Sequence, residues 1–330
     1  MSIDIKTANI EPLRHTFDHI EARIGKGKPA TRYQEGVHDF QMTQNFHYRP
    51  TWEPGLDLFD RRRTTIMLDD FDALVDPRQY YYAPYTIQRA KMQEAQDNNF
   101  TLVEKRNLFA TLAPEARARI EHVIVPLRHV EWGANTVNCY IAAYAYGTPF
   151  NSAALMQATD RLGLAQYVTR LALVLGGPEL LDRGKREWLE HADWQPLRRL
   201  VEDTMVIRDW FEAHVVQNLL MDGALYPLAY AHFDQALGAQ GGIGYTLATE
   251  FMREWHAEAV RWTDATIKVA VNASEANGAR VAGWVEQWEP RVREAVAPLA
   301  RAAFGESAAQ TADTVFAGLA ARRTKIGIGR

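Results

Sequence analysis

Two stretches of this chain, residues 127–175 and 197–271, each predict a pair of long helices. In the first, LRHVEWGANTVNCYIAAYAYG is separated from NSAALMQATDRLGLAQYVTRLALVL by a break at Thr148-Pro149. In the second, LRRLVEDTMVIRDWFEAHVVQNLLMDG at 197–223 is separated by a loop from TLATEFMREWHAEAVRWTDATIKVAV. Within 197–223 apolar residues recur at steps of seven and four, which places them on one face of a helix: Leu200, Ile207, Phe211, Val215 and Leu219. Because two helical hairpins can close into a four-helix bundle, the sequence predicts that architecture.

The segments around the hairpins predict further helices and an irregular N-terminal arm. Prolines and a glycine in NFHYRPTWEPGLDLFD forbid a continuous helix there. We therefore expect an extended arm over residues 1–84, with a short helix near 11–24, and a helical domain over 85–330. Arm and bundle are expected to form a single structural unit. The run Arg61-Arg62-Arg63 favours a solvated or acid-paired cluster over a phosphate site.

Within the helical domain, further helices are expected at 85–108, 113–125 and 179–192. Residues beyond Gly278 predict two helices split at Pro290, and the basic tail ARRTKIGIGR predicts a short strand or a docking segment. The loop GAQGGIG at 238–244 has no strand before it and no lysine after it, so a nucleotide-binding interpretation fails. The predicted fold class is all-α.

Composition excludes several classes of function. The net charge is −4, from 37 basic and 41 acidic residues, which gives no electrostatic case for nucleic acid or an acidic membrane as partner. A single cysteine, Cys139, excludes an intrachain disulfide and a cysteine-rich metal site. The start MSIDIKTANIEPLRHTF lacks the apolar segment of a signal peptide, and no apolar run is long enough to span a membrane. We therefore expect a cytoplasmic protein.

Helical bundles often hold a di-iron or di-manganese site, which requires two Glu-x-x-His pairs and two further glutamates. Residues three apart share a helix face, so carboxylate and imidazole reach one metal together. The one literal match is Glu35-Gly36-Val37-His38, which lies in the arm, contains a glycine and has no second copy. A chance match is the favoured interpretation.

The predicted core helices contain only fragments of this pattern. Asp160 is followed by Gly163 where a ligand histidine would be needed, and after Glu254 the histidine, His256, comes one residue too early. Glu250, Glu254 and Glu258 form a stripe for which Arg253 and Arg261 are candidate ion-pair partners. Four further residues are candidates to face the bundle centre: Glu131, Glu212, His129 and His214.

No other catalytic pattern is present. Cys139 lies mid-helix among apolar residues, where a buried, inert thiol is the expectation. The sequence contains no GxSxG nucleophile elbow. We therefore assign no catalytic, cofactor-binding or metal-binding residue. If Glu212 and Glu254 face inward without metal, each needs a partner, and Arg208 and Arg253 are the nearest candidates in sequence.

Six stretches carry a resemblance to a known family: RYQEGVHDFQMTQNFHYRPTWEP, VDPRQYYYAPYTIQRAKMQEA, VPLRHVEWGAN, QATDRLGLAQYVTRLAL, VEDTMVIRDWFE and TEFMREWHAEAVRWTDA. Together they resemble the β subunit of bacterial multicomponent phenol hydroxylases, relatives of the toluene and methane monooxygenases among soluble di-iron monooxygenases. The resemblance runs in the same order from about residue 32 to 326.

The resemblance implies a hydroxylase of two α, two β and two γ subunits. The α subunit holds the di-iron centre that activates O2, and the β subunit has the same ferritin-like fold without the iron ligands. In this register Asp160 and Gly163 stand where the α subunit has its first Glu and His, and Glu254 and Ala257 where it has its second pair. A separate reductase uses NADH, FAD and a 2Fe-2S cluster, and a small coupling protein completes the system.

Two hypotheses follow. The first is a non-catalytic structural subunit of a complex that hydroxylates phenols in aromatic hydrocarbon catabolism. The second is an autonomous ferritin-like metal-binding oxidase or storage protein, which iron analysis of the single chain would distinguish. A further hypothesis places the arm on the α subunit through its aromatic residues, the alternative being that the arm packs on its own bundle: Phe46, Tyr48, Trp52, Phe59 and the run Tyr80–Tyr82.

Overall fold

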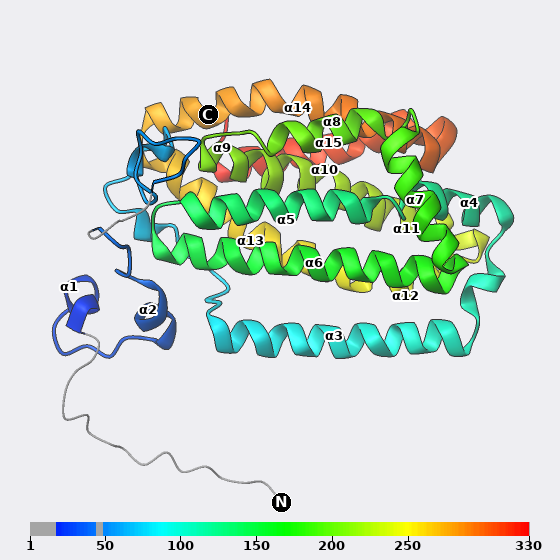
Figure 1. Ribbon diagram of the computed structural model, residues 1–330, viewed down its shortest axis with the longest axis horizontal. Coiled ribbons are helices and arrows are strands. Elements are labelled where there is room, and N and C mark those ends of the chain that lie inside the picture. Colours follow the sequence, from blue (N-terminus) through cyan, green and yellow to red (C-terminus); the bar gives the residue numbers. More distant parts are fainter. Residues whose placement is uncertain (1–17, 44–48, 330) are drawn as a thin grey trace, which may run out of the picture.

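The computed structural model describes residues 18–43 and 49–329 of the chain. Within these two ranges every regular element is a helix, which confirms the predicted all-α class. Four helical rods lie side by side as a bundle, and the remaining helices, some of them as long, pack around it (Figure 1). No helix in the described part of the chain has the length and apolar character needed to cross a membrane.

The first hairpin forms as the sequence predicts. Helix α5 (Leu127–Tyr144) and helix α6 (Thr148–Gly176) turn at Gly147, whose φ of 100° favours glycine. The two helices approach closely enough for the side-chain amide of Asn135 to donate to the backbone carbonyl of Ala158 at 2.8 Å. This hairpin forms the near face of the molecule in Figure 1.

The second hairpin differs from the prediction. Helix α8 (Gln195–Thr204) ends early, and the next helix begins at Trp210, so the prediction of one continuous helix from 197 to 223 was wrong. The cause lies at Asp209, whose Oδ1 accepts the backbone N–H groups of Phe211 and Glu212 at 2.9 and 3.2 Å. An aspartate in this position satisfies donors that a new helix start leaves free, so it favours a break.

The rod that begins at Trp210 continues to Leu237. It consists of α9 (Trp210–His214), a π-helical segment (Val215–Met221), α10 (Asp222–Tyr226), a second π-helical segment (Pro227–His232) and α11 (Phe233–Leu237). Gly223 does not end this rod. A Cβ there would lie 2.8 Å from Leu319 Cδ1, so the glycine permits close packing of α15 (Ala308–Ile326) against the rod.

Helix α13 (Glu250–Ala273) completes the bundle after the short α12 (Ile243–Ala248). It buries one face at helical spacing: Phe251, Met252, Trp255, Ala259, Trp262, Thr263, Thr266, Ile267, Ala270 and Val271. The turn before α12 includes Gly241, whose φ is 83° and whose Cβ, if present, would lie 2.2 Å from the carbonyl oxygen of Thr111. Only glycine fits that position.

Two C-terminal helices cover the far side of the bundle. Helix α14 (Glu275–Phe304) runs unbroken through Pro290 and Pro298, so the predicted split at Pro290 was wrong. An interior proline costs about 3 kcal/mol, but α14 buries twelve residues against its neighbours, Trp284 and Trp288 among them, and this packing outweighs the cost. Helix α15 (Ala308–Ile326) extends into the predicted tail, where we had expected a strand or docking segment.

The remaining helices match their predicted ranges within a few residues. They are α3 (Tyr82–Lys105), α4 (Pro114–Val123) and α7 (Pro178–Glu190). Helix α3 lies alongside the bundle over most of its length (Figure 1). It is the element that encloses the cleft described below.

In its described residues the N-terminal arm contains short helical pieces. These are α1 (Glu21–Ile24), α2 (Arg32–Val37) and single turns at Asp18–Ile20, Arg61–Arg63 and Phe71–Ala73; the rest of the helix expected at 11–24 lies outside the described residues. The later part of the arm packs into the main core through Ile66, Leu68, Phe71 and Leu74. The Arg61–Arg63 run is acid-paired as predicted, with Arg62 on Asp60 and Arg63 on Glu53.

Candidate functional site: the bundle centre and the cleft beside α3

The centre of the bundle holds a buried ion-pair network rather than a carboxylate pair. Arg161 of α6 donates from Nη1 to Glu131 of α5 at 3.0 Å and to the Tyr226 hydroxyl at 3.1 Å. Its Nη2 donates to Asp222 of α10. Tyr226 in turn donates to Glu131 at 2.7 Å, and the Gln217 amide donates to Asp222 at 3.1 Å. Three helices therefore meet at one guanidinium.

The surroundings of this network are apolar and aromatic. The Arg161 guanidinium lies over the Trp255 ring of α13, 4.5 Å from its centroid. Burial raises the pKa of the Glu131 carboxyl, and the positive charge of Arg161 opposes that shift. The same two effects act on Asp222. A buried charge is very costly without a partner, so Arg161 keeps both acids compatible with the core.

These residues do not fit a di-iron centre. Such a centre needs carboxylate and imidazole ligands directed at one point, whereas here a guanidinium already occupies the space between the two carboxylates. No group of three His, Cys, Asp or Glu ligand atoms converges at the bundle centre in the described ranges. Metal chemistry at this position therefore has no ligand set in this chain.

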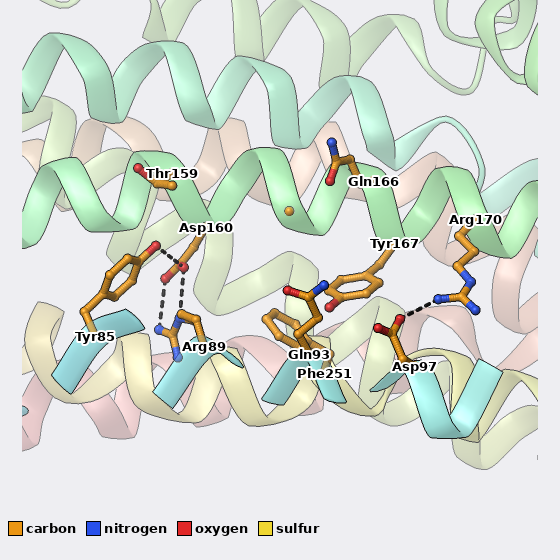
Figure 2. A pocket seen from close by; sticks show the side chains of 11 residues that line it. Tyr85, Arg89, Gln93, Asp97, Thr159, Asp160, Gln166, Tyr167, Arg170 and Phe251 are labelled. Carbon is orange, nitrogen blue, oxygen red and sulfur yellow. Dashed lines mark hydrogen bonds and ion pairs between the residues drawn. The ribbon is translucent and has the colours of Figure 1, made fainter. Parts of the chain in front are cut away.

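The second polar cluster ties α3 to the bundle (Figure 2). Asp160 of α6 accepts from Arg89 Nε and Nη2, both at 2.9 Å, and from the Tyr85 hydroxyl and Trp255 Nε1, also at 2.9 Å. Arg89 uses its remaining nitrogen on Glu258 of α13 at 2.8 Å. Every oxygen of Asp160 is thus engaged, which leaves it no free position for a metal or a proton-transfer role.

A cleft of about 360 Å³ opens beside this cluster, between α3 and α6. Figure 2 shows side chains of both helices directed into it, together with Phe251 of α13. Several of the polar side chains that line it are already paired with one another, such as Asp97 with Arg170 at 2.6 Å. We find no nucleophile next to a base among its lining residues.

The ligand register implied by the family resemblance does not place its residues at the bundle centre. Asp160 points to α3, and Gly163 lines the cleft without a side chain. Glu254 and Ala257 are exposed on α13. The residues that do face the centre are their neighbours Arg161 and Trp255.

The expected partners of the core acids were also wrong. Glu212 accepts from Trp288 Nε1 at 2.8 Å, not from Arg208, and burial raises the pKa of its carboxyl. Because Glu254 is exposed, it needs no buried partner. Arg253 lies 3.6 Å from Asp234 instead. The other two acids of the predicted stripe do find partners: Glu250 accepts from Asn99, and Glu258 from Arg89.

The candidate histidines are distributed over different parts of the core. His214 is fully buried between Asn218 and Thr266, each 3.0 Å from a ring nitrogen. His256 stacks on Tyr226, with ring centroids 4.9 Å apart. His129 stacks on Trp188, and burial lowers the pKa of its imidazole to about 4.

Two further sequence predictions concern residues outside the bundle centre. Cys139 is exposed on α5, so the expectation of a buried thiol was wrong. In the chance Glu-x-x-His match, His38 is buried with its Nδ1 3.8 Å from Asp72, while Glu35 lies in the first turn of α2.

The sequence interpretation missed Arg161, Asp222 and Tyr226. One signal was available: Arg161 stands in a segment whose neighbours Leu164, Val168 and Leu171 share its buried face. A charged residue on the apolar face of a helix indicates a buried partner. Which acid supplies that partner depends on how the helices pack.

A bundle of two helical hairpins with polar side chains at its centre has the architecture of the di-iron carboxylate proteins, without their ligand set. The chain belongs to the methane/phenol/alkene hydroxylase family, whose model matches residues 52–274. This confirms the family that the sequence predicts.

Individual relatives agree with this assignment. The chain is 45% identical to the phenol 2-monooxygenase oxygenase component DmpL of Pseudomonas sp. (strain CF600), over 99% of this chain and 98% of that relative. It is 21% identical to the hydroxylase component subunit beta of the toluene-4-monooxygenase system of Ectopseudomonas mendocina, over 70% of this chain and 71% of that one. Among solved structures, xenon-pressurized phenol hydroxylase from Pseudomonas sp. OX1 matches with a TM-score of 0.91 and 44% identity, covering 98% of both chains.

Proposed function

We propose that this chain is the non-catalytic structural β subunit of a phenol hydroxylase. The observation that carries the proposal is Arg161, whose guanidinium fills the bundle centre between Glu131 and Asp222. A fixed internal cation excludes a second one by repulsion. The chain therefore keeps the bundle architecture while a partner supplies the metal and the substrate site.

The proposed complex follows from the family. Its catalytic α subunit holds the di-iron centre, and a small γ subunit completes an α2β2γ2 hydroxylase. A reductase with FAD and a 2Fe-2S cluster delivers electrons from NADH, and a coupling protein regulates their use. One atom of O2 enters the phenol ring at the α subunit, in the cytoplasm. Arm and helical domain of this chain act in the complex as one structural unit.

The outer face of the α5–α6 hairpin is the surface that we propose for the α subunit. None of the exposed residues between Glu131 and Tyr144 of α5 carries a charge. The same holds for the exposed residues between Thr148 and Gln166 of α6. Three of them are large and apolar, namely Trp132, Leu155 and Leu162, which are 57%, 58% and 46% exposed. Interfaces concentrate their energy in such anchors, tryptophan above all.

Association with the catalytic subunit tests this proposal. Trp132→Asp and Leu162→Glu should each weaken assembly at least tenfold, because each puts a charge into a desolvated contact. Ile243→Asp is the matched control, since Ile243 is 53% exposed on α12, away from the hairpin. Hydroxylation of phenol should be lost when this chain is omitted and should track assembly in the variants. Full activity of the catalytic subunit without this chain would contradict the proposal.

A further inference from the structure

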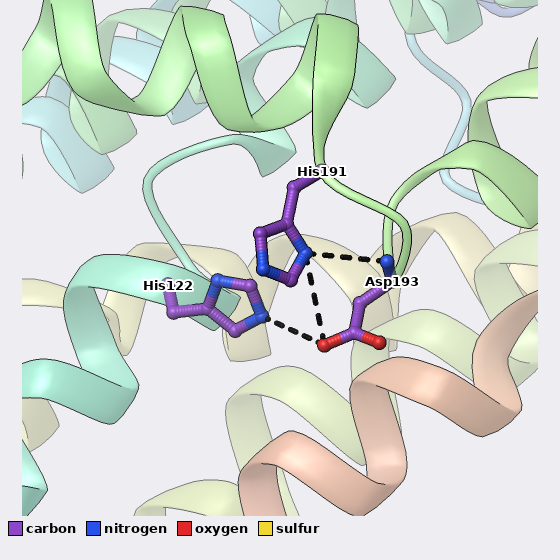
Figure 3. Close-up of side chains that lie close together, drawn as sticks. All are labelled: His122, His191 and Asp193. Carbon is purple, nitrogen blue, oxygen red and sulfur yellow. Dashed lines mark hydrogen bonds and ion pairs between the residues drawn. The ribbon is translucent and has the colours of Figure 1, made fainter.

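A cluster of two histidines and an aspartate lies outside the bundle centre, where α4, α7 and the loop before α8 meet (Figure 3). His122 comes from the last turn of α4, His191 from the C-terminal end of α7, and Asp193 from the loop. One ligand atom from each lies within 4.8 Å of the other two. The three side chains point toward one another in the close-up.

One pair of these atoms has the spacing of ligands around a tetrahedral ion. His122 Nε2 lies 3.3 Å from Asp193 Oδ2, and His191 Nδ1 lies 3.8 Å from the same oxygen. Zinc binds histidine and carboxylate ligands at roughly 2.0–2.2 Å, so two ligand atoms of a regular tetrahedron lie about 3.3–3.6 Å apart. The His122–Asp193 distance matches this geometry, and the His191 ring, whose Nδ1 accepts the backbone N–H of Asp193 at 3.2 Å, must turn toward the ion to complete it.

A fourth residue prepares His122 for this role. Glu187 of α7 lies with Oε2 2.8 Å from His122 Nδ1. When that carboxylate accepts the Nδ1 proton, Nε2 is left to coordinate, and Nε2 is the nitrogen that faces Asp193. Metal-binding histidines are usually held by such a carboxylate on their other nitrogen. Glu187 thus fixes the tautomer and orientation that His122 needs as a metal ligand.

Access from solvent is open. The side chains of His191 and Asp193 are 48% and 38% exposed, whereas those of His122 and Glu187 are about 20% exposed. An ion can therefore enter from the surface and meet an inner histidine whose orientation is fixed.

We propose that His122, His191 and Asp193 form a binding site for a divalent transition metal ion of the zinc type, with Glu187 positioning His122 and water as the fourth ligand. The site joins α4 to the turn between α7 and α8, with His122 and Asp193 71 positions apart, so the bound ion fastens these elements together. The role that we assign to the ion is structural. It is independent of the iron chemistry proposed for the partner subunit.

A metal-free explanation makes a different prediction. A protonated His122 bridging Glu187 and Asp193 accounts for two of the contacts, and the backbone N–H of Asp193, which donates to His191 Nδ1 at 3.2 Å, accounts for the position of His191. His191 is also the residue whose removal disturbs the core least, because it is the most exposed of the four. The His191→Ala variant therefore separates the two explanations.

The test titrates the full chain, first treated with a chelator, with ZnCl2 by calorimetry at pH 7.5. We expect one saturable site, and visible Co2+ bands of a four- or five-coordinate ion when cobalt replaces zinc. His191→Ala and Asp193→Asn should abolish the Co2+ bands and weaken zinc binding at least tenfold. Glu187→Gln should weaken it about 10- to 100-fold while the coordination spectrum is kept.

His19→Ala serves as the matched control, because His19 is exposed and lies outside the cluster. It should bind zinc like the parent chain. Circular dichroism should show His191→Ala as helical as the parent. Absence of saturable zinc binding in the parent, or equal affinity in the parent and in folded His191→Ala, would overturn the proposal.

Discussion

Arg161 donates a hydrogen bond to Glu131 across 3.0 Å at a depth where the two side chains are 1% and 5% exposed. Removing one partner of such a pair leaves an uncompensated charge, which costs about 3–5 kcal/mol. We therefore predict that Arg161→Met lowers the free energy of unfolding by about that amount, measured by urea denaturation. The triple variant with Glu131→Gln and Asp222→Asn should recover part of the loss.

A surface pair provides the control for this prediction. Arg170 and Asp97 are partly exposed at 36% and 49%, and pairs of that kind contribute less than about 1 kcal/mol. Arg170→Met should therefore change the free energy of unfolding little. Equal losses for the two arginines would contradict the role given to Arg161.

The attachment of α3 depends on Asp160, which accepts four hydrogen bonds from three residues. Asp160→Asn removes the carboxylate that holds Arg89, so we expect a loss of about 3 kcal/mol or more and faster amide exchange in α3. Hydrogen exchange followed by mass spectrometry measures the second effect. Uniform acceleration throughout the bundle, without an excess in α3, would show that α3 is not attached separately.

His214 gives the stability a defined pH dependence. Burial, aided by the positive charge of Arg322, lowers the pKa of its imidazole to about 3, from an ordinary value of 6.5. As the pH falls below 6.5 the unfolded chain binds a proton that the folded chain excludes, so stability is full above pH 6.5 and is lost progressively toward pH 3. The neutral ring is satisfied, accepting from Asn218 and donating to Thr266.

The measurement compares His214→Gln with the parent chain by urea denaturation at pH 7 and pH 5. Each pH unit below the unfolded pKa corresponds to about 1.4 kcal/mol, so the variant should lose about 2 kcal/mol less than the parent over this interval. Buried His256 remains in both chains and keeps some pH dependence in the variant. Identical losses in variant and parent would mean that His214 is protonated in the folded state.

The N-terminal arm remains our proposed second contact with the α subunit. Phe46 and Tyr48 lie outside the described residues, but Trp52 is 49% exposed and rests edge-on against Tyr144 of α5. Deleting residues 1–60 should weaken assembly with the α subunit and abolish hydroxylation, because aromatic anchors contribute roughly 2 kcal/mol or more each.

The core should survive this deletion, since the arm residues that belong to the main core lie between Ile66 and Leu74 and are kept. The deleted part also contains buried residues, namely Ile20, Tyr33, Val37, His38 and Pro50. Circular dichroism should therefore show a helical bundle. A truncated chain that is folded and assembles with undiminished affinity would refute the arm contact, and one that melts would show that the arm serves its own bundle.

The helices were predictable where the cause is local. The sequence predicted α5, α6 and α13 as long helices of two hairpins, and Asp209 fits the known preference for aspartate at a helix start. Predictions failed where packing decides. Gly223 continues a helix because it leaves room for α15, and Pro290 stays within α14 because residues on both sides of it, Trp288 and Val292, are buried. The Arg161 network joins residues 30 and 61 positions apart, a pairing that no local pattern contains.

The iron content of the purified full chain tests the central claim most directly. Iron is offered anaerobically as Fe2+, unbound metal is removed by gel filtration, and bound iron is counted per chain. With Arg161 between Glu131 and Asp222, we predict far less than one iron per chain in the His191→Ala variant, which removes the separate site proposed at His122. Replacing His129, His214 or His256 by alanine should not change the iron content of this chain or of the assembled enzyme. About two irons per chain, the content of a di-iron bundle, would contradict the account.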